Sequence, residues 1–194
     1  MSLTSSSTSP SSLSSPTIAN ILFIPLDSTG HVNACIGIGE RLLARGHHVS
    51  FAIEKCWQGI LNKNRNNNKK NPTKENENFE EHLYIDPSRP PGLGPNEYWL
   101  RSMKLIESTL HQDSLYKAGH QNVQEFEELI MDELYFDDQL EAIIQQVNPD
   151  IIILDTYSTY PAVYLSGRPW IHMTSANPLS VLPHPDTPPA GSGE

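Results

Sequence analysis

The sequence has very few cysteines and no long apolar segment, and both absences exclude whole classes of protein. Its two cysteines, Cys35 and Cys56, give no disulfide framework, and the eight histidines form no metal-ligand spacing with cysteines or acids. We therefore predict two reduced, buried thiols and no metal site. No apolar run reaches the length that spans a bilayer, so we predict no association with a membrane.

Positively charged residues are also scarce. Thirteen Lys and Arg stand against 23 Asp and Glu, which gives a formal net charge of -10. Such a chain is not attracted to phosphate backbones, and its small basic cluster at residues 63–74 lacks interleaved aromatics, so we predict no nucleic-acid partner. No Lys or Arg precedes Arg41, so the start of the chain lacks the basic region of a secretory signal. We expect a cytoplasmic protein.

Composition divides the chain into one folded region between two tails. Residues 1–17 are almost all Ser, Thr and Pro, and we predict that they are disordered because they bury too little apolar surface to fold. Residues 183–194 are rich in Pro, Gly and Ser and predict a flexible tail. Residues 18–182 have the length of one domain with a core. Within them, the Asn- and Lys-rich residues 62–78 predict a mobile surface loop.

Apolar runs alternate with amphipathic segments in the folded region. Runs that are apolar on both faces are typical of central parallel strands. The fold class is therefore predicted as α/β, a Rossmann-like parallel sheet flanked by helices. We expect strands at residues 18–26, 47–53, 83–86, 150–155 and 169–175, a first helix from an N-cap at Asn33 to Gly46, and later helices at 96–118, 123–147 and 160–165.

Two polar residues follow predicted strands. His31 comes after the first strand, in a Gly30-His31 turn, and Asp155 closes the strand at 150–155. The first and fourth strands of a doubly wound sheet are commonly neighbours, so these side chains can meet. A histidine accepts a proton best when a carboxylate orients its other nitrogen, so the pair predicts acid–base catalysis. In the alternative interpretation, Asp155 caps the next helix and His31 hydrogen-bonds only to backbone.

Two stretches carry a resemblance to a known family. FIPLDSTGHVNACIGIGERLLARGHHVSFAI, residues 23–53, and NPDIIILDTYSTYPAVYLSGRPWIHMTSANPL, residues 148–179, resemble the N-terminal half of a UDP-glycosyltransferase. The chain is similar to the cytosolic macrolide-type and arthropod members, and the resemblance extends over residues 18–182 apart from the Asn/Lys insert. It implies a GT-B fold of two Rossmann-like halves, in which the N-terminal half binds the acceptor and the C-terminal half binds the nucleotide sugar.

The resemblance also implies roles for individual residues. His31 matches the general base that takes the proton from an acceptor hydroxyl, and Asp155 matches the carboxylate that orients and charge-balances it. We expect Gly30, Trp99 and Tyr157 to bind the acceptor, a small lipophilic hydroxylated molecule. The co-substrate is a UDP-sugar, the sugar is transferred with inversion, and neither a metal nor another cofactor is expected.

The donor-binding motif of the family does not occur in this sequence. We therefore expect a partial UDP-glycosyltransferase that lacks its donor-binding half and is inactive alone, because transfer requires donor and acceptor to be held together. One alternative is a catalytically silent acceptor-binding module. Another is an acceptor subunit that recruits a separate donor-binding chain, which predicts an exposed apolar patch.

Overall fold

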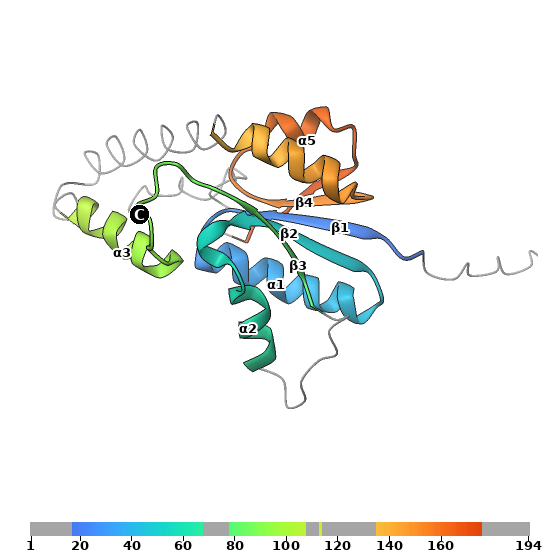
Figure 1. The fold of residues 1–194 in the computed structure, drawn as a ribbon, viewed down its shortest axis with the longest axis horizontal. Helices are drawn as coiled ribbons and strands as arrows, with labels where there is room; N and C mark the ends of the chain where they lie inside the picture. The colour runs from blue at the N-terminus through green and yellow to red at the C-terminus, as the bar shows by residue number, and fades with distance from the viewer. Residues whose placement is uncertain (1–16, 68–77, 108–112, 114–134, 176–194) are drawn as a thin grey trace, which may run out of the picture.

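A computed structural model describes residues 17–67, 78–107, 113 and 135–175. Five parallel strands form one sheet in the order β3-β2-β1-β4-β5 (Figure 1). The switch point lies between β1 and β4, where the strand order reverses its direction. The predicted α/β fold class and the pairing of the first with the fourth strand are therefore confirmed. The strands are β1 (Asn20–Pro25), β2 (His48–Glu54), β3 (Glu80–Tyr84), β4 (Ile151–Asp155) and β5 (Trp170–His172).

Helices cover both faces of the sheet (Figure 1). On one face, Val32 and Cys35 of α1 pack on Phe23 and Phe51, together with Leu61 of α2. On the other face, a helix that includes residues 135–147 packs with α5 on the apolar side chains of β1 and β4. The labelled helices are α1 (Thr29–Ala44), the 3-10 turn η1 (Lys55–Trp57), α2 (Ile60–Asn67), α3 (Pro95–Ile106) and α5 (Pro161–Leu165).

Helix α1 begins earlier than the sequence predicts, and this changes the position of His31. Its N-cap is Ser28, which is extended (φ −145°, ψ 139°) and whose carbonyl accepts from Val32 N at 2.9 Å. The predicted N-cap, Asn33, lies one turn inside the helix. Ser28 is itself a favoured cap residue, and the first-turn N–H groups need no intrahelical partner. His31 therefore lies in the first turn of α1 and not in the loop before it. At the other end Gly46 has a φ of 90°, which is typical of the predicted C′ glycine.

The third strand begins earlier in the chain than the sequence predicts. It is an edge strand that begins at Glu80 and ends at Tyr84, whereas residues 83–86 were predicted. Acidic side chains are tolerated there because the strand has a neighbour on one side in the described sheet, and Glu81 accepts from Gly59 N at 2.7 Å.

The Asn/Lys insert is described only in part. Its residues 62–67 belong to α2, and Asn62 exchanges two hydrogen bonds with the backbone of Phe79, at 2.9 and 3.0 Å. Residues 68–77 lie outside the described residues, as do residues 1–16 of the predicted N-terminal tail and the whole predicted tail at 183–194. Residues 108–112 and 114–134 of the predicted helical region, and residues 176–182, also lie outside them. In the described ranges, no helix combines the length and apolar character needed to cross a bilayer.

Phe51 belongs to the core cluster between the sheet and α1. It is fully buried in β2, stacks on Phe23 with ring centroids 5.1 Å apart, and meets Phe79 edge-on at 4.9 Å. We expect Phe51→Ala to lower the free energy of unfolding by about 3–5 kcal/mol, because the lost ring leaves a cavity. Urea unfolding measures this loss. Tyr164→Ala, at a side chain that is 71% exposed, is the control, and a Phe51→Ala loss below about 1 kcal/mol contradicts the assignment.

Candidate acid–base site

The side chains of His31 and Asp155 meet at the carboxyl end of the sheet. Pro25 at the end of β1 is in register with Asp155 at the end of β4, and Leu26 N donates to the Asp155 carbonyl at 2.9 Å. The chain then turns through Ser28 into α1, whose first turn carries His31 over the end of β4. As a result, His31 Nδ1 lies 3.1 Å from Asp155 Oδ2.

The Asp155 carboxylate is almost completely buried. Its side chain is 1% exposed, and that of His31 is 12% exposed. Asp155 Oδ1 accepts from Ser175 N at 3.0 Å, whereas Oδ2 has no partner with hydrogen-bond geometry in the described part of the chain. A buried carboxylate is costly without a compensating positive or donor group. The imidazole at ion-pair distance is that group, and the negative charge favours a proton on Nδ1.

Ser175 completes the group, and sequence reasoning assigned it no role. Its hydroxyl lies 3.1 Å from His31 Nδ1, while its backbone N–H donates to Asp155. Ser175 follows β5, which pairs with β4, so it lies at the same edge of the sheet as Asp155. Its place just after a predicted strand is the feature of the sequence that could have indicated a role at the site. Ser175 thus contacts both members of the pair from the segment that follows β5.

The three predicted acceptor-binding residues differ in how they lie relative to His31. Tyr157 lies edge-on to the His31 ring, with centroids 5.7 Å apart, and is 48% exposed. Gly30 precedes His31 in the exposed first turn of α1, and nothing lies within 4 Å of the position that a Cβ would take there. Trp99 belongs to α3, and its side chain lies outside the described residues. Of the side chains that the structure describes among them, that of Tyr157 contacts the His31 ring.

This geometry suits proton transfer from a hydroxyl group. With its proton on Nδ1, a neutral imidazole keeps the lone pair of Nε2 for a substrate proton. The buried carboxylate then stabilises the imidazolium that forms and keeps the ring oriented. The arrangement therefore has the chemistry that a general base requires.

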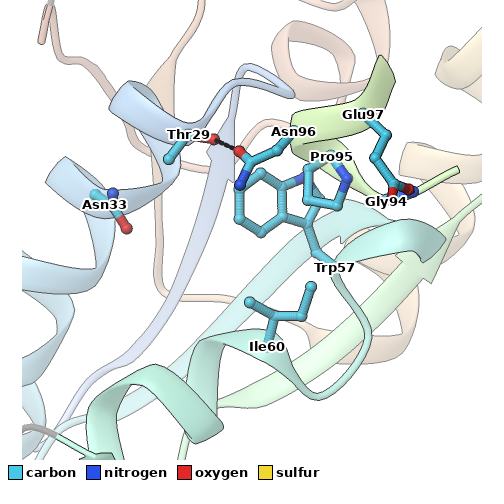
Figure 2. A pocket seen from close by; sticks show the side chains of 8 residues that line it. All are labelled: Thr29, Asn33, Trp57, Ile60, Gly94, Pro95, Asn96 and Glu97. Carbon is cyan, nitrogen blue, oxygen red and sulfur yellow. Dashed lines mark hydrogen bonds between the residues drawn. The ribbon is translucent and has the colours of Figure 1, made fainter. Parts of the chain in front are cut away.

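A pocket of about 410 Å³ is lined by residues of α1, η1, α2 and the start of α3 (Figure 2). Thr29 and Asn33, one helical turn apart on α1, form one side of it, and His31 points from a different side of the same helix. Thr29 Oγ1 donates to Asn96 Oδ1 of α3 at 2.9 Å. Among the side chains that the structure describes, no predicted site residue lines the pocket. Its lining is Thr29, Asn33, Trp57, Ile60, Gly94, Pro95, Asn96 and Glu97.

Asp27, Glu54 and Cys56 gather closely enough to suggest a metal site, with their ligand atoms within 4.8 Å of one another. The guanidinium of Arg89, however, pairs with Asp27 and donates to Cys56 Sγ at 3.1 Å. Burial and the neighbouring Glu54 raise the pKa of the Cys56 thiol, so it is a poor metal ligand. These residues do not fit a metal ion.

Neither cysteine forms a disulfide. Cys35 is buried in α1, as predicted, whereas Cys56 is only partly buried. Burial, with a smaller contribution from the charge of Asp155, raises the pKa of the Cys35 thiol. Both side chains are therefore protonated and unreactive as nucleophiles.

Comparisons with known proteins give structural likeness alone. No protein-family model matches the chain, and no curated protein matches it. The solved structure of the glycosyltransferase of kitacinnamycin is 18% identical, with a TM-score of 0.49 over 82% of this chain and 31% of its own. UGT73P12 of Glycyrrhiza uralensis, solved with glycyrrhetinic acid 3-O-monoglucuronide, is 15% identical, with a TM-score of 0.45 over 80% of this chain and 28% of its own. CalG4, the calicheamicin glycosyltransferase, is 15% identical, with a TM-score of 0.44 over 82% of this chain and 31% of its own. This chain spans less than a third of each of them.

Proposed function

We propose that this chain is the acceptor-side part of an inverting UDP-glycosyltransferase, with His31 as the general base and Asp155 as the residue that orients it. The observation that carries the proposal is the 3.1 Å contact between His31 Nδ1 and the buried Asp155 carboxylate. Residues 23–53 and 148–179, which resemble this family in sequence, are the two stretches that form the contact. The family resemblance suggests the reaction, and the contact between His31 and Asp155 supports the assignment of His31 as its base.

In the proposed reaction, an acceptor hydroxyl donates a hydrogen bond to His31 Nε2. The proton passes to Nε2 as the hydroxyl oxygen forms a bond to the anomeric carbon of the UDP-sugar. The bond between that carbon and the UDP oxygen breaks, and UDP leaves with the electron pair, so the configuration inverts. Asp155 stabilises the imidazolium, which then releases its proton to water.

The proposed acceptor is a small lipophilic molecule with a hydroxyl group. The half-exposed ring of Tyr157 beside His31 offers an aromatic surface to such a molecule, and Gly30 leaves space next to the base. Trp99 is proposed as a further contact. The UDP-sugar is proposed to bind mainly to a donor-binding part, whether in the same chain or in a partner chain, in a cytoplasmic protein.

A transfer assay tests this function. The protein is purified natively from its own source, so that any further segment or associated chain is retained, and is given 4-methylumbelliferone with UDP-glucose, UDP-galactose or UDP-glucuronic acid. We expect release of UDP and a glycoside of inverted configuration, read from its anomeric proton coupling by NMR. Binding of the phenol without transfer from any donor contradicts the proposal and favours the silent acceptor-binding module.

A further inference from the structure

Arg89 is a buried cation in the loop between β3 and α3. The residue is 9% exposed and contacts several elements at the carboxyl edge of the sheet. It pairs with Asp27 after β1, and its Nε lies 3.6 Å from Oε2 of Glu54 at the end of β2. Its Cζ lies 4.1 Å from the centre of the Tyr98 ring on α3. One side chain therefore joins the ends of β1 and β2 to α3.

These contacts lead to two groups of residues that line the pocket in Figure 2. Asp27, which pairs with Arg89, also accepts from Trp57 Nε1 at 2.6 Å, and Trp57 forms one wall. Tyr98, on which the guanidinium packs, follows Asn96 and Glu97, which form another wall. Arg89 itself does not line the pocket. It lies behind both walls and links them.

Arg89 joins the middle of this loop to the ends of β1 and β2. At the start of the loop, the backbone of Ile85 exchanges two hydrogen bonds with the Gln139 side chain, at 2.9 and 3.0 Å. Within residues 85–94, Asp86 and Arg89 are the buried residues, and Asp86 accepts from Ser88 inside the loop. Buried ion pairs contribute little net stability because desolvation offsets their attraction. The planar guanidinium of an arginine does fix the relative orientation of its partners, because it forms directional hydrogen-bonded ion pairs and stacks on an aromatic ring.

We infer that Arg89 is a positioning residue, which sets the separation of the pocket walls and thereby the affinity for the acceptor. This inference rests on the proposed function. The pocket suits an apolar molecule with hydroxyl groups, because Trp57, Ile60 and Pro95 supply apolar surface and the amides of Asn33 and Asn96 supply donors and acceptors. Arg89 acts on such a ligand only through the walls that it holds.

Two variants test the inference, since each leaves the buried carboxylates with a cation. Arg89→Lys keeps the positive charge but loses the planar guanidinium, and Tyr98→Leu removes only the aromatic ring on which the guanidinium packs. We expect amide hydrogen exchange in residues 86–98 to become about tenfold faster, and the KM for 4-methylumbelliferone to rise about tenfold, with kcat within about twofold. The Kd of the phenol, measured by calorimetry, should rise with KM. Arg168→Lys is the matched control, because Arg168 pairs with Asn148 at the opposite edge of the sheet.

Unchanged exchange in both variants overturns the inference. Faster exchange with an unchanged Kd and KM overturns the role in binding, and a fall in kcat at constant KM moves Arg89 into catalysis and overturns it as well. A wild-type protein that binds the phenol but transfers no sugar refutes the proposed function alone, and exchange and Kd still decide the role of Arg89. A wild-type protein that does not bind the phenol overturns the assignment of the pocket.

Discussion

His31→Ala is expected to lower kcat by about 10²- to 10⁴-fold, the usual contribution of a general base. The KM for the acceptor should change little, because the other proposed acceptor contacts, among them the Tyr157 ring beside the base, remain in the variant. A steady-state assay that varies the acceptor at saturating UDP-sugar separates the two parameters. Loss confined to kcat identifies an interaction that acts in the transition state.

The variant must also fold, since the alanine leaves Asp155 Oδ2 buried without its imidazole. His31→Gln avoids this, because its side-chain amide can donate to the carboxylate but cannot take up a proton. We expect the same loss of kcat with a normal circular dichroism spectrum. His48→Ala, at the exposed start of β2 on the opposite edge of the sheet, is the control. A kcat for His31→Gln within about tenfold of the wild type excludes His31 as the base.

The central strands and the switch point were predictable because they follow from simple patterns. β1 is buried on both faces, and β4 is buried on one face and partly buried on the other, so their sequences are continuous apolar runs. The first and fourth strands of a doubly wound sheet are commonly neighbours, and on this basis the sequence predicted that His31 and Asp155 can meet. The edge strand β3 was misplaced because its charged first residues resemble a loop.

The start of α1 and the supporting residues were not predictable in the same way. Ser28 and Asn33 are both good N-caps, and the backbone conformation of Ser28 decides between them. Ser175 reaches His31 across 144 positions in the sequence, and Arg89 reaches Asp27 across 62. Such contacts depend on the register and twist of the finished sheet, which no local pattern encodes.

Asp155→Asn is expected to lower kcat by about 10²- to 10⁴-fold while preserving the fold. The Ser175 N–H needs an acceptor, so the new amide must keep its oxygen in the Oδ1 position and place its NH₂ group toward His31 Nδ1. Nδ1 then becomes an acceptor, and the imidazole proton moves to Nε2. In that tautomer Nε2 has no lone pair for the acceptor hydroxyl, and the stabilising charge is lost as well.

Nitrogen-15 NMR of the imidazole separates this mechanism from simple loss of structure. We expect the proton on Nδ1 in the wild-type protein and on Nε2 in Asp155→Asn, because the tautomer follows the group that faces Nδ1. Asp150→Asn is the matched control: it makes the same change just before the other end of β4, where Asp150 Oδ2 accepts from Asn20 N at 2.8 Å. It should leave both the tautomer and kcat unchanged. An unchanged tautomer in Asp155→Asn, even with reduced kcat, shows that Asp155 does not orient His31.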